Sequence, residues 1–319
     1  MPKKCQEYLK ALVIDGVISN ETLIQTSYCN TLLSLFKQTN AVKISKKTKS
    51  TPFSVVKSQN GRLFALYNPS KGNGIAKGAQ GIIVVAQDIL TKETCLAKIQ
   101  KVPLTKKNNE IDSIRKEVSF IQRNELLYGY QERIDTDKNV TTTYIFMKEL
   151  PGLPVSDENN STQCFETLYA KKLTEAEKMI ILRNLLINFM ALSKANIIHK
   201  DLYPRNILID PLDNFKVYFV DWGKSLEMNN EGIALGYAEH DFQKKKPVKY
   251  ANGADFLTLT DTFLELNLLD NNVIGNEVRK IVKTCGDLKS NYQKIDVSPL
   301  IHLIEAELSE KHKTRFSND

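Results

Sequence analysis

The chain of 319 residues has no apolar run near the ~20 residues that a membrane span requires, so we expect no transmembrane segment. Its N-terminus starts basic, but Asp15 interrupts the short apolar stretch and no small-residue cleavage site follows, which argues against a secretory signal. The five cysteines are odd in number, scattered and without metal-ligand spacing. This pattern argues against a disulfide framework or a zinc site, and we predict free thiols in a reducing, cytoplasmic compartment.

The sequence also lacks internal repeats and any RNA- or DNA-binding signature, so a nucleic-acid partner is not expected. Hydrophobic residues make up 42% and charged residues 25%, as in ordinary folded proteins, and the length suits one large domain or two lobes. Charge is uneven. Residues 1–150 hold 23 Lys+Arg against 13 Asp+Glu, a net of +10, while residues 151–319 have a net of −3. The basic half predicts an anionic partner, although a merely soluble basic surface explains it equally well.

The first 150 residues divide into two parts. Residues 1–50 place apolar side chains at helical spacing and predict a separate helical extension. Residues 53–67 carry Asn60-Gly61 between two β-rich runs, a strong signal for a β-hairpin. Further strands fit residues 82–86, 94–100 and 142–147, and an amphipathic helix fits residues 109–124. The simplest assembly of residues 51–150 is a small, mostly antiparallel sheet with one helix.

Residues 151–319 read as mainly helical. Thr174 and Glu177 form a capping box for a helix that runs to about Lys194. Other helices fit residues 255–269, 273–285 and 298–313, and residues 224–254 read as a loop. The fold class predicted from the whole chain is α+β, with a β-rich first part and a helical second part.

Two carboxylates and one amide stand out in residues 197–223. Asp201 and Asn206 are five residues apart on a loop that follows the long helix. Asp221 follows an apolar strand over residues 217–220. One carboxylate can accept a proton from an attacking hydroxyl, while an amide and a second carboxylate can hold Mg²⁺ against a triphosphate. The layout therefore suits phosphoryl transfer.

Three further features precede this stretch. Residues 76–83 fit G-x-G-x-x-G-x-V with alanine in the first place, and Gly78 and Gly81 would let the backbone approach phosphate oxygens. Lys98 follows on a strand, and Glu117 lies further along on the amphipathic helix. Taken singly, each has a plainer interpretation: a turn, a lysine on an edge strand and an exposed helical glutamate.

Taken together and in this order, the motifs resemble those of eukaryotic-type protein kinases. Residues 199–206 resemble H-R-D-L-x-x-x-N and residues 221–223 resemble D-F-G. The resemblance runs from about residue 74 to residue 266. It implies a bilobal protein-kinase-like fold, with residues 51–150 as the small lobe and residues 151–319 as a short, helical large lobe.

The resemblance also implies a role for each candidate residue. Asp201 would be the catalytic base, and Asn206 and Asp221 would be the ligands of Mg²⁺ or Mn²⁺. Asp255 would lead the buried helix that braces the catalytic loop. The residues implied around ATP are Lys98 with its ion-pair partner Glu117, the loop residues Gly78 and Gly81, and the hinge residues Met147, Glu149 and Leu150.

Several positions depart from the family pattern. Lys200 replaces the usual arginine, and Tyr203 replaces a lysine near the γ-phosphate, a charge that Arg205 would supply instead. Trp222 replaces the phenylalanine of D-F-G. Residues 224–254 contain one serine and no threonine, so we do not expect activation by Ser/Thr phosphorylation there. The expected substrate is a protein Ser/Thr hydroxyl, with Tyr still open.

An anionic ligand, such as an inositol polyphosphate or a phosphoinositide, is the regulator that these departures and the basic first half predict. The candidate contacts are Lys43, Lys46, Lys47, Lys49, Lys106, Lys107, Arg115 and Lys116. Two alternatives to a protein kinase stay open: a pseudokinase that acts as a binding module, and a small-molecule or lipid kinase. The divergence is similar to that of effector kinases that intracellular bacteria, Legionella among them, deliver into a host cytosol.

Overall fold

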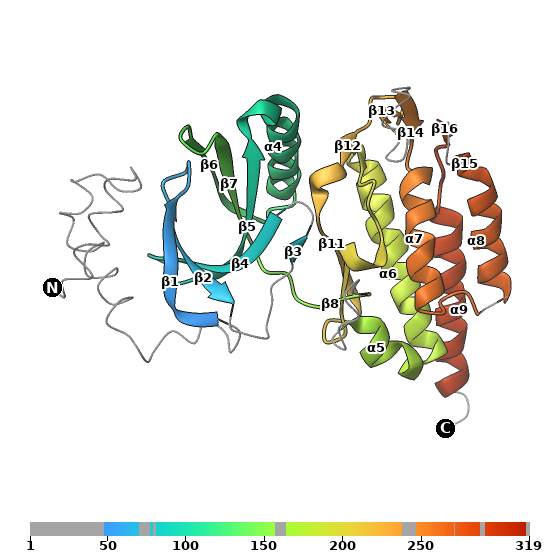
Figure 1. Cartoon of the computed structure of the whole chain (residues 1–319). Helices are drawn as coiled ribbons and strands as arrows, with labels where there is room; N and C mark the ends of the chain where they lie inside the picture. Colours follow the sequence, from blue (N-terminus) through green and yellow to red (C-terminus); the bar gives the residue numbers. More distant parts are fainter. Residues whose placement is uncertain are drawn as a thin grey trace. The chain divides into compact units, whose positions relative to one another are not determined.

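The structure is a computed structural model of the chain, drawn in Figure 1. It describes residues 48–69, 77–78, 81–156, 164–237, 247–270, 272–287 and 291–316. Two compact units make up the chain, Met1–Glu149 and Leu150–Asp319. Within the described ranges, no helix is long and apolar enough to cross a membrane. The helical extension predicted for residues 1–50 lies almost wholly outside these ranges.

The first unit contains an antiparallel sheet in the order β1-β2-β4-β5-β7-β6, with β3 paired to β4. The strands are β1 Thr48–Lys57, β2 Leu63–Pro69, β3 Lys77–Gly78, β4 Gly81–Asp88, β5 Thr94–Pro103, β6 Leu127–Asp135 and β7 Val140–Met147. The predicted hairpin is present, because Val55 pairs with Ala65 and the chain turns at Asn60-Gly61, where Gly61 has a φ of 83°. Every strand predicted in this unit forms.

Two strands of this sheet were not predicted: the two-residue strand β3 and the longer strand β6. The sequence of β6, LYGYQERID, shows no apolar alternation beyond its first residues, and most of its side chains are only half-buried. The strand lies at the edge of the sheet and pairs with β7 from Leu127–Met147 to Asp135–Val140. Because only one side of an edge strand is paired and its faces are partly solvated, its sequence carries a weaker pattern.

Apolar packing on both sides of the sheet holds the first unit together. Helix α4, Lys107–Arg123, buries the predicted stripe of isoleucine and valine side chains. Within the sheet core, the rings of Phe64 and Phe146 stack with centroids 3.9 Å apart. Burial of such rings removes a large apolar area from water and dominates the energetics of a small core.

The second unit is mainly helical, as predicted. Its helices are α5 Phe165–Tyr169, α6 Glu175–Lys194, α7 Gly253–Glu265, α8 Asn272–Thr284 and α9 Ser298–Phe316. Helix α6 is buried along much of its length, with Ile181, Leu182, Leu185 and Leu186 fully inside, and it contacts both α7 and α9. This central helix therefore sets the position of the segment that leaves its C-terminal end.

The second unit also contains nine short strands within the described ranges. They are β8 Leu153–Pro154, β9 Ile197–Ile198, β10 Ile207–Asp210, β11 Lys216–Phe219, β12 Leu226–Glu227, β13 Ala234–Tyr237, β14 Pro247–Tyr250, β15 Gly286–Asp287 and β16 Asn291–Tyr292. Strands β12 to β14 correct the prediction that residues 224–254 are only a loop. Each is short and is stabilised by distant partners: β12 pairs with β9, and β14 pairs with β13 and β16.

The capping box at the start of α6 gives a first test. Thr174 accepts a hydrogen bond from the backbone N–H of Glu177, whose carboxylate accepts one from the backbone N–H of Thr174. We expect Thr174→Ala to lower the free energy of unfolding by about 1 kcal/mol, because it removes the side chain that caps the helix. Urea denaturation measures the change. Thr174→Ser keeps the hydroxyl and should stay near wild type; an equal loss in both variants would contradict the capping role.

Candidate active site

The candidate site of the second unit lies on the segment that follows α6. This segment forms β9, a loop, the 3-10 turn Pro204–Asn206 and then β10. Strand β9 pairs with β12, and β10 pairs with β11 and β8, so hydrogen bonds hold the loop at both ends. The loop is therefore a rigid platform for Asp201 and Asn206 rather than a free connection.

Asp255, near the start of α7, holds the loop in place through two hydrogen bonds. Its Oδ2 accepts the backbone N–H of His199 and its Oδ1 accepts that of Lys200, both at 2.7 Å. Lys200 has a φ of 65°, in the left-handed region that costs a non-glycine residue about 1 kcal/mol or more. The Asp255 carboxylate offsets this cost because it binds both amides in the orientation that the turn requires.

Asp201 sits immediately after this turn and is nearly buried, with 5% of its side chain exposed. Its Oδ2 accepts a hydrogen bond from the Asn206 amide nitrogen at 2.9 Å. Two cations approach its Oδ1: Nη2 of Arg205 at 3.2 Å and Nζ of Lys224 at 3.1 Å. A carboxylate has about four lone-pair positions, so these contacts fix its orientation without using all of its capacity to accept a proton.

Asn206 and Asp221 come from neighbouring segments. The backbone carbonyl of Asn206 accepts the N–H of Val220 at 3.0 Å, which ties Asn206 to the residue before Asp221. Asp221 turns away from strand β11 with a φ of 63°. The Asn206 amide nitrogen donates to both the backbone carbonyl and the carboxylate of Asp201, which leaves the amide oxygen as the atom that can meet a cation.

This donor set fits Mg²⁺. Magnesium prefers oxygen ligands and is commonly held by one or two protein groups, with phosphates and water completing its octahedron. One amide oxygen and one carboxylate suit that arrangement. No group of three or more His, Cys, Asp or Glu side chains capable of holding a metal occurs within the described ranges. With one amide oxygen and one carboxylate, the two predicted ligands suit a cation that arrives with a nucleotide.

His199 fills the space beneath the site as a neutral ring. It is fully buried, lies 4.8 Å from Trp222 between ring centroids, and also contacts Phe219. Burial lowers the pKa of His199 to about 4; the negative charges of Asp201 and Asp221 oppose this and the charge of Lys224 adds to it. All three charged groups therefore lie within electrostatic range of one neutral ring.

Lys98 and Glu117 meet in the first unit. The Lys98 Nζ is 2.6 Å from Oε1 of Glu117, and the two side chains are 8% and 2% exposed. Strand β5 lies between β4 and β7, so the plainer interpretation of Lys98 as an edge-strand lysine is wrong, as is that of Glu117 as an exposed glutamate. A buried ion pair is costly to desolvate and adds little net stability. A contribution to stability is therefore a weak explanation of the pair formed by Lys98 and Glu117.

The other predicted nucleotide contacts also belong to known elements. Gly78 pairs with Gly81 across β3 and β4. A Cβ at Gly81 would lie 2.5 Å from the Ile99 carbonyl oxygen, so tight strand packing alone requires glycine there. Met147 ends β7 and is half-buried, Glu149 is exposed, and Leu150 is half-buried. Their roles toward ATP stay predictions.

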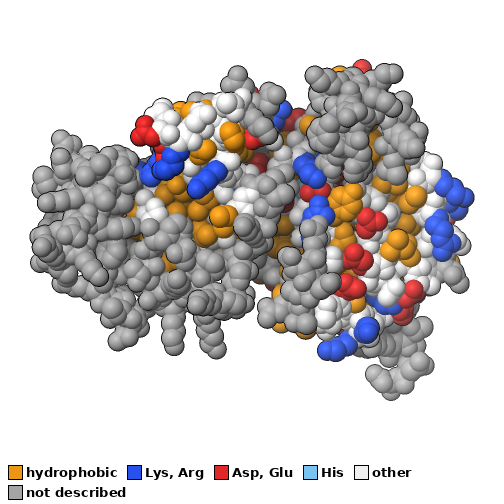
Figure 2. Space-filling view, viewed as in Figure 1, with side chains coloured by type: hydrophobic (Ala, Val, Ile, Leu, Met, Phe, Trp, Pro, Cys, Tyr) orange, Lys and Arg blue, Asp and Glu red, His pale blue; other side chains and the backbone are white. Residues whose placement is uncertain are grey.

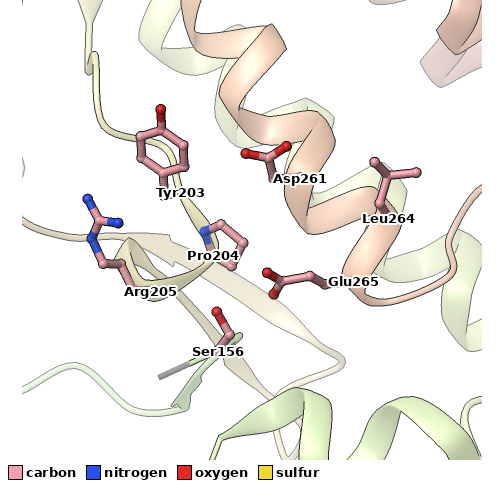
Figure 3. Close-up of a pocket in the computed structure, with 7 residues that line it drawn as sticks. All are labelled: Ser156, Tyr203, Pro204, Arg205, Asp261, Leu264 and Glu265. Atoms are coloured by element: carbon pink, nitrogen blue, oxygen red, sulfur yellow. The ribbon is translucent and has the colours of Figure 1, made fainter. Parts of the chain in front are cut away.

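A pocket of about 400 Å³ adjoins the loop that carries Asp201, inside the second unit (Figure 3). Tyr203, Pro204 and Arg205 line it from the loop, and Asp261, Leu264 and Glu265 line it from α7, with Ser156 completing the wall. Burial raises the pKa of Asp261 and also that of Glu265. Because Asp261 and Glu265 both lie on α7, this side of the pocket is acidic.

The predicted basic cluster is tested only in part. Lys43, Lys46 and Lys47 lie outside the described residues, and the side chains of Lys49, Lys106 and Lys107 are likewise not described. Lys116 is exposed, whereas Arg115 makes two bonds to Glu132, at 2.8 and 3.0 Å. Basic and acidic side chains also occur together on the face in Figure 2. The anionic ligand stays a prediction.

Lys224 is the site residue that the sequence interpretation did not single out. It stands in the 3-10 turn Trp222–Lys224, directly after the D-W-G motif. The kinase pattern has no requirement for a lysine at this place, and local spacing gives no signal for its contact with Asp201, 23 residues earlier. Long-range pairing brings the two segments together, through β9 with β12 and through the backbone bond from Val220 to Asn206.

Comparison with known structures identifies the architecture. The crystal structure of the BubR1 kinase domain superposes with a TM-score of 0.54 and 16% sequence identity, over 91% of this chain and 95% of that one. The chain has a protein-kinase-like fold. The predicted fold class, α+β with a β-rich first part and helical second part, is thereby confirmed. At this level of identity, the likeness shows the fold alone.

Sequence comparison gives a shorter match. A segment of 64 residues is 33% identical to the probable serine/threonine-protein kinase ireA of Dictyostelium discoideum, covering 20% of this chain and 6% of that protein. No protein-family model matches the chain. The match thus supports a relation to protein kinases, while the chain spans only a small part of the relative's length.

His199 belongs to the loop and Asp255 binds the loop. Their contributions to the free energy of unfolding change with pH in opposite directions. The lowered pKa of His199, about 4 against an ordinary 6.5, contributes stability above pH 6.5 that is lost as the pH falls toward 4. Burial raises the pKa of Asp255 to about 7 from 3.8, against the effect of its two amide bonds. Its contribution is full below pH 3.8 and is lost as the pH rises toward 7.

We expect His199→Phe and Asp255→Asn to tilt the stability curve in opposite directions. Unfolding in urea at pH 4, 5, 6 and 7 measures the free energy of each variant against wild type. The loss in His199→Phe should grow with rising pH by about 3 kcal/mol, and the loss in Asp255→Asn should grow with falling pH. Differences that do not change with pH would show that neither group titrates between the folded and unfolded states as described.

Proposed function

We propose that the chain is an ATP-dependent protein kinase that transfers the γ-phosphoryl group to a protein hydroxyl, Ser/Thr first and Tyr second. The observation that carries the proposal is the fixed carboxylate of Asp201, nearly buried and hydrogen-bonded to Asn206 on an anchored loop. A nearly buried carboxylate that retains proton-accepting capacity has the chemistry of a general base. The kinase-like fold and the 64-residue match support the same conclusion.

In the proposed reaction, Asp201 accepts the proton of the substrate hydroxyl while the hydroxyl oxygen bonds to the γ-phosphorus and the bond to ADP breaks. Asn206 and Asp221 would hold Mg²⁺ or Mn²⁺, which neutralises phosphate charge when bound. Lys98, paired with Glu117, would bind the α- and β-phosphates. Gly78 and Gly81 would shape the loop over them, and Met147, Glu149 and Leu150 would meet the adenine.

Asp201→Asn and Asp221→Asn test the proposal most directly. Each should lower the rate of transfer from labelled ATP by about a thousandfold, because one removes the proton acceptor and the other a cation ligand. Asp213→Asn is the matched control. Asp213 is an exposed carboxylate between β10 and β11 that pairs only weakly with Lys216, at 3.6 Å, and its loss should leave the rate unchanged.

The same assay separates the alternatives. A pseudokinase would bind ATP, seen as a rise in the unfolding temperature, without labelling any protein. A lipid or small-molecule kinase would consume ATP with lipids, sugars or inositols while leaving proteins unlabelled. Full activity in both Asp201→Asn and Asp221→Asn would refute the assigned roles.

The pocket beside the loop supports a preference within the proposed function. Asp261 and Glu265 present carboxylates to a space that adjoins Arg205 and Tyr203 of the catalytic loop (Figure 3). Two carboxylates on one wall would attract a cation that enters the pocket. We therefore propose that the pocket accepts a basic side chain of the protein substrate.

The double variant Asp261→Asn with Glu265→Gln tests this preference. It should raise KM about tenfold for a peptide with a lysine or arginine near the acceptor hydroxyl, while KM for ATP stays unchanged. A peptide with alanine in place of the basic residue should show no difference between the variant and wild type. Glu231→Gln, in an exposed turn, is the control for loss of a surface charge. Equal KM values for both peptides in wild type would contradict the preference.

A further inference from the structure

Two cations meet the candidate base, and they come from different segments. Arg205 is four residues after Asp201 and belongs to the same loop. Lys224 comes from the turn that follows Asp221, and its Nζ is 3.1 Å from the same Oδ1 atom. A bond within one loop fixes only the local geometry of that loop. The bond from Lys224 fixes the base relative to the segment that carries the predicted metal ligand.

The relative position of these segments matters for phosphoryl transfer. The base must meet a hydroxyl that attacks a phosphorus whose position depends on the cation, and a misplacement of about 1 Å costs about a hundredfold in rate. Backbone bonds join the segments at a distance from the carboxylate, through Val220 with Asn206 and through β9 with β12. Lys224 makes a side-chain bond to the carboxylate itself.

Burial distinguishes this ion pair from an ordinary surface contact. Asp201 is 5% exposed and Lys224 is 29% exposed, so the carboxylate end of the pair is largely shielded from water and salt. Arg205 is more exposed, at 37%, and its guanidinium also lies over the ring of Tyr203, 5.0 Å from the centroid. Arg205 therefore lines the pocket in addition to binding the carboxylate of Asp201.

We propose that Lys224 is a positioning residue for the transfer reaction: it holds the carboxylate of Asp201 in register with the Asp221 segment. The charge beside the base that the sequence pattern attributes to Arg205 then comes in large part from Lys224. This inference rests on the proposed function, because it assigns a role to Lys224 in the same reaction. Lysine suits the role because its ammonium is a compact charge with several donors.

The test compares Lys224→Met, Lys224→Arg and Lys224→Ala with wild type. Lys224→Met keeps the length of the side chain and removes its charge, and we expect kcat to fall about a hundredfold with KM for ATP unchanged. Lys224→Arg should recover most of the rate. Since Lys224 is partly exposed, methylammonium added to Lys224→Ala should restore part of kcat, which a purely structural role would not allow.

Lys216→Met is the matched control. Lys216 begins β11 in the same unit, and its exposed side chain contacts Asp213 and Tyr218, so its loss should change neither kcat nor the unfolding temperature. An unchanged kcat in Lys224→Met would overturn the inference while wild-type transfer upheld the proposed function. A loss of kcat matched by loss of folding, without recovery by arginine or methylammonium, would also overturn it. A wild-type chain without transfer would refute both proposals.

Discussion

The buried carboxylate of Asp255 is the constraint on which the rest of the site depends. It accepts two successive backbone N–H groups, of His199 and Lys200, at 2.7 Å each. Without an acceptor at this place, two buried amides would be unsatisfied, and the left-handed turn at Lys200 would have no compensation. A residue at the start of α7 thus fixes the direction in which Asp201 leaves the turn, more than fifty residues earlier in the chain.

A neutral ring and several charged groups lie close together around this loop. His199 is held neutral by burial, and the charged groups of Asp201, Asp221 and Lys224 lie within electrostatic range of its ring. A second positive charge at His199 would be unfavourable in this apolar space. Asp201 therefore takes its compensating charge from the side chains of Arg205 and Lys224, which retain contact with water.

The sequence predicted the helices and turns that are specified by neighbouring residues. The capping box at Thr174, the hairpin turn at Gly61 and the apolar stripe of α4 each lie within a few residues of the structure they specify. Strands β12 to β14 have no such signal, since each is short and forms by pairing with distant segments. Strand β6 lacked an alternating pattern because it lies at a partly solvated edge.

The residues of the candidate site also differ in whether a local sequence signal predicts them. Asp201, Asn206 and Asp221 were found because their spacing within one stretch suits phosphoryl chemistry. The contact of Lys98 with Glu117 followed only from the resemblance, since nothing in their spacing requires a strand and a helix to meet at 2.6 Å. Neither the spacing of residues nor the resemblance to kinases pointed to Lys224. Its contact depends on long-range pairing, of β9 with β12 and of Val220 with Asn206, which is a property of the folded unit rather than of either segment.

Lys200 stands where the kinase pattern usually has an arginine, and its ammonium group lies over an aromatic ring. The Lys200 ammonium lies 4.4 Å from the centre of the Tyr250 ring, and Tyr250 stacks on Tyr292 with centroids 5.0 Å apart. A cation over an aromatic face gains about 0.5–2 kcal/mol without any anion. An arginine's planar fork would suit a phosphate, whereas a lysine over a ring is stabilised by groups the chain already contains. The segment around Tyr250 therefore has a partner for this cation without phosphorylation, in agreement with a loop that contains one serine and no threonine.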